Sequence, residues 1–374
     1  MSFLDEINKY DPNWVLEQIE DKKNIDVERA LLREHPRTED LMALLSPAAE
    51  DYIEEIASRA HRTTVQRFGR TILLYAPIYL SNECTNGCLY CGFSAHNKIH
   101  RRTLSLDEVE KEAEYLHSQG FRHVILLTGE ALHAADNSLI LAAANRIRHL
   151  FSSISIEVYP MEVEEYQQTI TAGVDGLTIY QETYDKRLYA EMHPFGKKRD
   201  YNYRILTPER AGKAGMRRIG IGTLLGIGNF RSEGFFTCLH AMYLARHYWQ
   251  TQLSVSFPRI RPADGGFNPL NPVSDRHFVQ LICALRLMFP DVGLVLSTRE
   301  SAQLRDDLLP LGITQMSAGS CTAPGGYQGK DSGAQQFTID DSRTPEEMCV
   351  LIRSKGYDAV WKDWDRAFLD KIAV

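Results

Sequence analysis

The stretch Thr71–Leu80 (TILLYAPIYL) runs directly into Ser81–Phe93 (SNECTNGCLYCGF), and these residues decide the fold. The first part is almost wholly apolar, which is typical of a buried strand. The second part carries Cys84, Cys88 and Cys91, separated by three residues and then by two. Three thiolates on one loop can bind three irons of a 4Fe–4S cluster, whereas a fully ligated cluster takes four cysteines. The spacing therefore predicts a cluster with one iron open to a small molecule.

A structural zinc site is the alternative interpretation of this loop. A Cys-x-x-Cys pair is more often a zinc site or a redox dithiol, and His96 or His100 could complete a Cys₃His zinc site. The chain would then be a barrel-shaped binding protein. The preceding strand, Tyr90 and the Gly-Phe pair after Cys91 favour the cluster.

The composition is that of a globular protein with a large core, since 44% of the 374 residues are hydrophobic and 10% are aromatic. A net charge of −7 argues against nucleic acid or an anionic membrane as the main partner. The sequence shows neither a secretory signal nor a run of about 18 apolar residues. Four of its seven cysteines are scattered singly, which suits a reducing compartment. We expect a cytoplasmic protein.

Strand and helix patterns alternate along most of the chain. Residues 1–70 read as a helical extension, and residues 321–374 as a loop and helical tail that closes the barrel. Between them, amphipathic helical patterns separate eight apolar runs: Thr71–Leu80, His123–Thr128, Ile154–Tyr159, Gly176–Gln181, Arg218–Leu225, Gln252–Phe257, Gly293–Ser297 and Ile313–Ser317. Near-continuous apolar strands that alternate with helices indicate a parallel sheet covered by helices. Eight such units predict an α/β fold, a (β/α)₈ barrel of the TIM type, over residues 71–320.

Catalytic groups of such a barrel gather where the strands end at their carboxyl side. Several arginines fall at adjacent strand ends, and they suggest capture of a carboxylate, because a guanidinium fork matches its two oxygens. Any single one of these residues would also suit a surface turn or a structural ion pair. The candidates are Thr128, Gly129, Glu130, Glu157, Gln181, Arg204, Arg259, Arg261, Arg299 and Ser317.

The three-cysteine loop resembles that of radical S-adenosylmethionine enzymes in its spacing and in the aromatic Tyr90 before the third cysteine. The resemblance implies that Cys84, Cys88 and Cys91 bind a 4Fe–4S cluster. S-adenosylmethionine chelates its open iron, and one electron from the cluster cleaves the sulfonium to give a 5′-deoxyadenosyl radical. It further implies that the cofactor is bound by Tyr90, Thr128, Gly129, Glu130, Glu157, Gln181 and Arg204.

Further strings narrow the resemblance to the tyrosine lyases of thiamine thiazole biosynthesis, the 2-iminoacetate synthases. They are Tyr180–Tyr184 (YQETY), Arg218–Gly226 (RIGIGTLLG), Ser256–Pro262 (SFPRIRP), Leu296–Glu300 (LSTRE) and Trp361–Asp365 (WKDWD). The resemblance implies cleavage of the Cα–Cβ bond of L-tyrosine to 2-iminoacetate and p-cresol, with 5′-deoxyadenosine and methionine as co-products. It implies thiazole synthase as a partner and a flavodoxin-type or other reductant. Arg299 would bind the substrate carboxylate, with Ser317 assisting.

Two other lyases of aromatic amino acids are rival interpretations. The tyrosine lyase of hydrogenase maturation has a second cysteine-ligated cluster, but Cys349 has no Cys-x-x-Cys partner here, which favours the thiazole enzyme. A tryptophan-cleaving enzyme is not excluded by residue identity.

Overall fold

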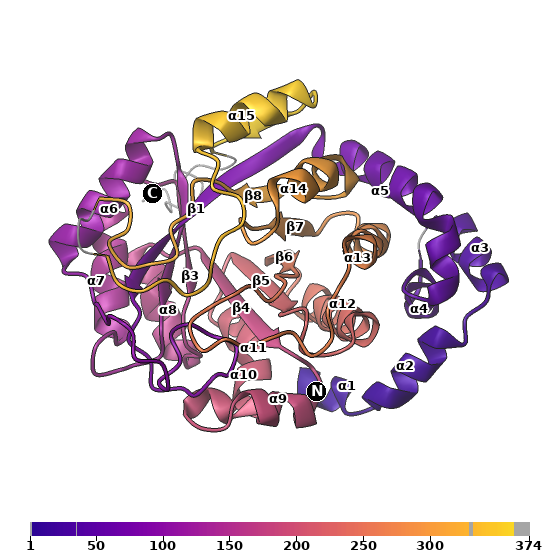
Figure 1. Cartoon of the computed structure of the whole chain (residues 1–374), viewed down its shortest axis with the longest axis horizontal. Coiled ribbons are helices and arrows are strands. Elements are labelled where there is room, and N and C mark those ends of the chain that lie inside the picture. Colours follow the sequence, from indigo (N-terminus) through magenta and orange to yellow (C-terminus); the bar gives the residue numbers. More distant parts are fainter. Residues whose placement is uncertain (1, 35, 329–331, 363–374) are drawn as a thin grey trace, which may run out of the picture.

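Helices form the whole N-terminal part of the chain, as predicted for residues 1–70. The computed structural model describes residues 2–34, 36–328 and 332–362. In Figure 1 this part is an arc that wraps one side of the molecule, and most of its helices pack on two helices of the barrel, α12 (Phe230–His247) and α13 (Asp275–Met288). The elements are α1 (Phe3–Ile7), α2 (Pro12–Glu20), α3 (Asn24–Leu32), α4 (Thr38–Leu44), the 3₁₀ helix η1 (Pro47–Tyr52) and α5 (Ile53–Phe68).

Eight parallel strands close into a barrel, because β1 pairs with both β2 and β8 in the order β2-β3-β4-β5-β6-β7-β8-β1. The predicted (β/α)₈ fold is confirmed. The strands are β1 (Thr71–Ser81), β2 (His123–Thr128), β3 (Ser153–Glu157), β4 (Gly176–Glu182), β5 (Arg218–Thr223), β6 (Gln252–Ser256), β7 (Gly293–Leu296) and β8 (Gln315–Ser317).

The outer layer consists of the helices between the strands. These are α6 (Leu106–Ser118), α7 (Asn137–Ile147), α8 (Val163–Ala172), α9 (Lys186–Met192), α10 (Tyr201–Ile205), α11 (Thr207–Lys213), α12 (Phe230–His247), α13 (Asp275–Met288) and α14 (Ala302–Leu308), with the 3₁₀ helices η2 (Lys197–Arg199) and η3 (Leu309–Leu311). The glycines expected to stop helices before the next strand do so: Gly120, Gly173 and Gly215 all have positive φ, which glycine adopts without a steric cost.

The tail adds a helix that was predicted and a strand that was not. α15 (Pro345–Ser354) begins at the Thr344 capping box, as the sequence indicates. β9 (Asp358–Val360) then pairs in parallel with Thr71–Leu73 at the start of β1. Three residues are too few to show a strand period, so β9 could not be predicted from the pattern. Trp364 and Asp365 lie outside the described residues.

The barrel has an apolar outer core and an interior cavity lined by both polar and apolar side chains. Along β1, Leu74, Ile78 and Leu80 are fully buried in the hydrophobic core, whereas Tyr75 and Tyr79 line a cavity inside the barrel. This is the period-two alternation of a strand. The cavity has a volume of about 280 Å³. The interior is therefore shaped to hold a small molecule as well as to pack.

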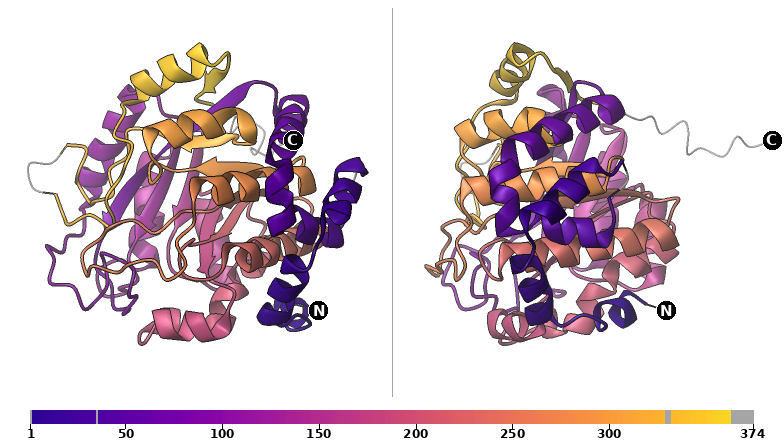
Figure 2. Two further views of the ribbon diagram at one scale, coloured as in Figure 1. Left: turned by 45° about the vertical axis from the view of Figure 1, so that its right-hand side comes forward. Right: turned by 90° about the vertical axis from the view of Figure 1, so that its right-hand side faces the viewer.

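The segment after β8 crosses the carboxyl ends of the strands and is fixed there. The amide of Gly92 in the cysteine loop donates to the Gln336 carbonyl (3.0 Å), and the amide of Asp340 donates to the Thr298 carbonyl (2.9 Å). In the left view of Figure 2, this segment and the loop after β1 lie on the same side of the barrel. The expectation that the C-terminal part closes the barrel agrees with these contacts.

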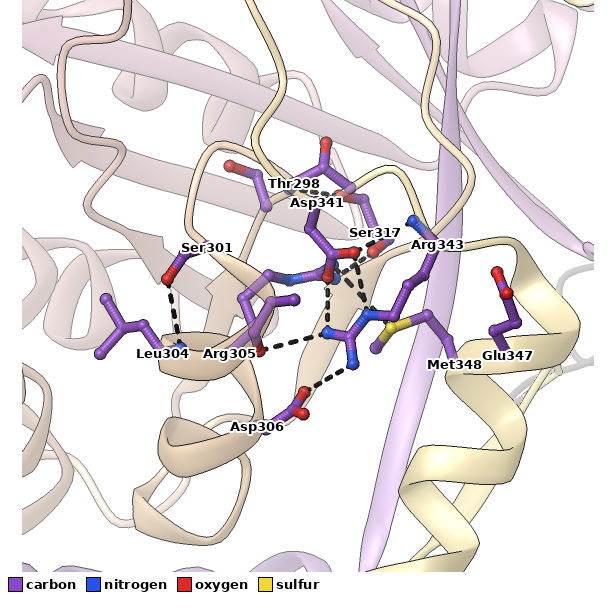
Figure 3. A network of polar contacts seen from close by, with 12 residues as sticks. Thr298, Ser301, Leu304, Arg305, Asp306, Ser317, Asp341, Arg343, Glu347 and Met348 are labelled. Atoms are coloured by element: carbon purple, nitrogen blue, oxygen red, sulfur yellow. Dashed lines mark hydrogen bonds and ion pairs between the residues drawn. The ribbon is translucent and has the colours of Figure 1, made fainter.

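A buried ion-pair network holds this segment to β8. Asp341 pairs with the guanidinium groups of Arg305 and Arg343, and Arg305 also donates to the carbonyl of Ser317 (Figure 3). The side chains of Arg305 and Asp341 are wholly buried. Burial opposes ionisation of Asp341, yet the two arginines hold its pKa below the usual value. The network connects the end of α14, the end of β8 and the segment before α15.

Asp341→Ala should therefore destabilise the protein. It leaves Arg305 as a buried charge without its carboxylate, and breaking such a pair costs about 3–5 kcal/mol. Denaturant unfolding of the two proteins measures the difference. Asp340→Ala is the matched control, because Asp340 is half-exposed in its pair with Arg261, and such surface pairs contribute about 1 kcal/mol or less. An equal decrease in the free energy of unfolding in the two variants would contradict the prediction.

Candidate active site

The cysteine loop is held rigidly against two other segments. Its Gly87 and Leu89 amides donate to the carbonyls of Phe195 and Met192 (3.2 and 3.1 Å). The guanidinium of Arg101 donates to the carbonyls of Asn82, Phe93, Ser94 and Asn97 at 2.6 to 3.3 Å. Backbone groups that a loop would otherwise leave unpaired are thus satisfied, so the loop keeps one shape.

The Thr128-Gly129-Glu130 turn at the end of β2 packs directly on this loop. A side chain at Gly129 would meet the Glu83 carbonyl oxygen at 2.2 Å, so only glycine fits. The Glu130 carboxylate accepts from Asn86 Nδ2 (2.7 Å), which also lies 3.8 Å from Cys84 Sγ. The prediction that this turn lies beside the cysteines agrees with the structure.

The three thiols face a common cavity of about 120 Å³, which Thr128, Gly129 and Glu130 also line. Cys88 is buried, and burial raises its thiol pKa to about 12, opposed by Lys198. Gln336 Nε2 lies 3.9 Å from Cys91 Sγ. Lys198 and Gln336 thus offer charge and hydrogen-bond donors to sulfur ligands, and the residues fit a thiolate-ligated cluster. In the part of the chain that the structure describes, no three His, Cys, Asp or Glu side chains are grouped around a single metal position.

A carboxylate and two cations form the far wall of this cavity. Glu182 accepts from Lys198 Nζ (2.6 Å) and from Arg204 Nη2 (3.3 Å), and Arg204 Nε donates to the Tyr180 carbonyl (2.7 Å). Burial opposes ionisation of Glu182, but Lys198 and Arg204 hold its pKa below the usual value. The predicted Arg204 thus lies at the cofactor cavity, already paired with one carboxylate.

Gln181 does not reach this cavity, contrary to its interpretation as a cofactor contact. The pairing of β4 with β5 shifts between Tyr180 and Glu182, and Glu182 has a positive φ of 71°. Side chains alternate between the two faces of a strand, so Tyr180 and Glu182 both line the cavity and Gln181 between them faces away from it. Gln181 points instead to a small enclosed space beside Tyr184 and His240. Glu182 takes the position that was assigned to Gln181.

Tyr90 and Glu157 complete the cofactor cavity. The Tyr90 hydroxyl pairs with His193 Nε2 at 2.7 Å, and Lys198 Nζ lies 5.6 Å from the centre of its ring. Glu157, at the end of β3, lines both this cavity and the larger one inside the barrel. Burial raises the pKa of Glu157 to about 7, against the opposing charge of Arg299. Its carboxyl group therefore changes charge near neutral pH.

If ionised Glu157 accepts hydrogen bonds from the cofactor ribose, S-adenosylmethionine should bind more tightly as the pH rises from 6 to 8. A group with a pKa near 7 goes from about one-tenth to about nine-tenths ionised over that range, so affinity should increase roughly tenfold. Anaerobic calorimetry of the cluster-loaded protein measures this. Glu157→Gln cannot ionise and should show a flat profile; a flat profile in the unmodified protein would contradict the assignment.

Arg299 lies where the two cavities meet. It lines both of them, and its guanidinium stacks on Phe337 at 3.3 Å from the ring centre. Among the described residues, no carboxylate pairs with it. Arg259 and Arg261, by contrast, are both paired with Glu300. Of the three arginines predicted at these strand ends, Arg299 is the one available to an incoming carboxylate.

Ser317 lies at the end of β8 and lines the barrel cavity with Arg299. Its hydroxyl accepts from the Thr298 amide (3.0 Å), one residue before Arg299. Ser317 thus fixes the backbone that presents Arg299. Its predicted assisting role in substrate binding stays a prediction.

Several residues of the two cavities were missed in the sequence. Lys198 stands in a basic run that looks like a solvated surface, and Gln336 and Phe337 come from a loop with no periodic pattern. The polar side chains inside the barrel were also missed: Tyr75, Tyr79, His123, Ser155, Tyr180 and Arg218. The apolar runs offered one usable signal, namely Tyr75 and Tyr79, which lie four residues apart and therefore on the same face of β1.

Comparison with known proteins agrees with this site. Residues 78–233 match the radical SAM superfamily, and residues 256–358 match the biotin and thiamin synthesis associated domain. The 2-iminoacetate synthase of Salmonella typhimurium is 45% identical over 349 residues, 93% of each chain. This chain belongs to the 2-iminoacetate synthase family. The Escherichia coli 2-iminoacetate synthase is 43% identical over 97% of each chain.

A solved structure supports the family's fold. The crystal structure of HydG, a maturase of the [FeFe]-hydrogenase, superposes with a TM-score of 0.88 at 30% identity, covering 94% of this chain and 80% of that one. As a member of the 2-iminoacetate synthase family, the chain is a radical S-adenosylmethionine lyase with a 4Fe–4S cluster and S-adenosylmethionine as its cofactors. The zinc-loop interpretation is therefore wrong. No helix in the described ranges is both long and apolar enough to span a bilayer.

Proposed function

We propose that this member of the 2-iminoacetate synthase family binds L-tyrosine through Arg299 and breaks its Cα–Cβ bond inside the barrel, giving 2-iminoacetate and p-cresol. The observation that carries the residue assignment is the Arg299 guanidinium at the junction of the two cavities, where no carboxylate of the described residues pairs with it. A guanidinium that keeps its fork free binds a carboxylate through two parallel hydrogen bonds. Arg299 would thereby hold the amino group of the substrate at the boundary with the cofactor cavity.

The barrel cavity suits the rest of a tyrosine side chain. Its wall is mixed, with the rings of Tyr75 and Tyr180 beside Ile125 and Leu127, and with polar groups of His123 and others deeper inside. A phenol needs apolar contact along its ring and a hydrogen-bond partner at its hydroxyl. The interior offers both, and it would keep water away from the radical fragments.

The cofactor cavity provides matching groups for the cluster and S-adenosylmethionine. Cys84, Cys88 and Cys91 would hold the cluster, Glu130 would receive the methionine ammonium and Arg204 its carboxylate. Tyr90, Thr128, Gly129 and Glu157 line the same cavity and would contact the remainder. When bound, the pair supplies a 5′-deoxyadenosyl radical that takes a hydrogen atom from the substrate.

We further propose that thiazole synthase receives the 2-iminoacetate, that a flavodoxin-type or other one-electron donor supplies the reductant, and that the protein works in the cytoplasm. Membership of the 2-iminoacetate synthase family supports the proposals on thiazole synthase and on the electron donor. All seven cysteines, each within the described residues, are free thiols, which supports a reducing compartment.

Anaerobic turnover tests the proposed function. The cluster-loaded protein is incubated with dithionite, S-adenosylmethionine and either tyrosine or tryptophan, and the products are identified by mass spectrometry. We expect p-cresol, together with glyoxylate from hydrolysis of 2-iminoacetate, from tyrosine only. Cleavage of tryptophan with tyrosine left intact would overturn the substrate assignment.

A further inference from the structure

Glu182, the carboxylate on the far wall of the cofactor cavity, has a strained backbone conformation. Its φ is 71°, and it is the one non-glycine residue with a positive φ in the part of the chain that the structure describes. This conformation is unfavourable for a residue that carries a Cβ atom, and it persists only where the surrounding structure imposes it. Contacts from outside β4 must therefore hold Glu182 in place.

The carboxylate of Glu233, on α12, supplies such contacts. It accepts hydrogen bonds from the Thr183 hydroxyl and from the Tyr184 amide (3.0 Å), which belong to the two residues that follow Glu182. The carbonyl of Glu182 itself accepts from the Leu224 amide (2.9 Å), just after β5. The strained residue is thus fixed from β5 at its own carbonyl and from α12 at the turn that follows it.

Glu233 is retained in this position although its burial is unfavourable. Its side chain is only 2% exposed, and none of the ion pairs among the described residues includes it. Burial raises the pKa of its carboxyl group to about 7, against the two hydrogen bonds from the turn. A buried carboxyl group without a cation is costly. The Gly228 backbone makes room for it, since a Cβ atom there would meet Glu233 Oε1 at 2.3 Å.

The direction of the Glu182 side chain determines how two cations of the cofactor cavity are held. Lys198 Nζ and Arg204 Nη2 both donate to the same oxygen, Oε1 (2.6 and 3.3 Å). Among the described residues nothing donates to Oε2, so this oxygen is open to a donor group of S-adenosylmethionine. Relaxation of φ to a negative value would change the direction of the side chain and disturb its pairing with both cations.

We propose that Glu233 is a positioning residue, which holds Glu182 in the conformation that the cofactor cavity needs to bind S-adenosylmethionine. Glu233 lines neither of the two cavities, so it acts through the turn after β4 and does not touch the cofactor. The proposal concerns the binding of the cofactor alone, and it therefore does not depend on which amino acid the enzyme cleaves.

Anaerobic calorimetry of the cluster-loaded variants with S-adenosylmethionine tests this role. Glu233→Ala should bind the cofactor at least about tenfold more weakly, the effect of losing one charge-assisted hydrogen bond. Glu233→Gln should stay within about threefold of the unmodified protein, because its amide oxygen can accept from Tyr184 and its amide nitrogen can donate to Thr183. Unchanged affinity in Glu233→Ala, or an equal loss in Glu233→Gln, overturns the proposal.

Glu209→Ala is the matched control for the loss of a buried carboxylate. Glu209, on α11, is 4% exposed and also accepts from a backbone amide and a hydroxyl, those of Phe3 (2.7 Å) and Tyr243 (3.1 Å). It lines neither cavity. Both alanine variants should unfold at a lower denaturant concentration, whereas only Glu233→Ala should lose affinity for the cofactor. An equal loss of affinity in Glu209→Ala would leave stability as the whole effect and overturn the proposal.

A double-mutant cycle shows whether Glu233 acts through Glu182. In a Glu182→Ala background the positioned carboxylate is gone, so Glu233→Ala should cause no further loss of affinity. A second loss of the same size would overturn the proposal. Thr183→Val removes one of the two hydrogen bonds at nearly constant volume, and it decides the question if Glu233→Ala does not fold. It should weaken cofactor binding about threefold in the unmodified protein and leave it unchanged in Glu182→Ala; unchanged affinity in both backgrounds overturns the positioning role.

Discussion

Cys88→Ala should yield a folded protein that holds no stable 4Fe–4S cluster and forms no 5′-deoxyadenosine above background. Cys88 is the most buried of the three loop cysteines, and it lines the cofactor cavity with Cys84 and Cys91. Two remaining thiolates cannot hold a cube while leaving one iron open. Iron and acid-labile sulfide analysis after anaerobic reconstitution measures the cluster, and chromatography measures deoxyadenosine.

Cys349→Ala is the matched control for this loss. Cys349 is also buried, but it lies on α15, far along the chain from the loop, and burial raises its pKa. Iron content and deoxyadenosine formation should be unchanged in this variant. Deoxyadenosine formation that survives in Cys88→Ala would remove Cys88 from the cluster, and an iron content halved in Cys349→Ala would reveal a second metal site.

The sequence was sufficient for the barrel and for the sites formed by neighbouring strands. Strand positions followed from apolar runs, since both the hydrophobicity and the period of a run are local properties of the chain. The Thr128–Glu130 turn could be assigned to the cysteine loop, because β1 and β2 are consecutive and pair in register. Consecutive βα units place the carboxyl ends of their strands side by side. The order of the strands along the chain therefore predicts the order of their ends around the barrel.

The sequence was insufficient where a long-range contact decides the geometry. Gln181 is a different case, because the period-two alternation of β4 already turns it away from the cavity that Tyr180 and Glu182 line, and its assignment overlooked that period. Gln336 reaches the cysteine loop across more than two hundred residues. Arg259, Arg261 and Arg299 cannot be told apart in the sequence. In the structure the first two pair with Glu300, and also with Asp275 and Asp340 respectively, whereas Arg299 does not pair with Glu300.

Arg299→Ala should abolish p-cresol formation while cluster content and S-adenosylmethionine affinity survive. The guanidinium stacks on Phe337 and lines both cavities. Among the described residues it makes no contact with the cysteines, so its removal should leave the cluster site intact. Without it the substrate carboxylate loses its anchor. A misplacement of the amine by about 1 Å can cost roughly a hundredfold in rate. Product analysis under single-turnover conditions, with calorimetry of S-adenosylmethionine binding, measures both properties.

Arg299→Lys distinguishes a clamp from a simple positive charge. Lysine keeps the positive charge but cannot form the two parallel hydrogen bonds of a planar guanidinium. Compared with Arg299→Ala, it should therefore restore part of the tyrosine affinity and little of the p-cresol yield. Both variants should form some deoxyadenosine without p-cresol, because the cofactor groups remain while the substrate amine is no longer held in place. Normal turnover of tyrosine by Arg299→Ala would place the carboxylate elsewhere. Arg259 or Arg261 would then have to leave Glu300 when substrate binds, and Glu300→Gln, which weakens that pairing, should in that case increase tyrosine affinity.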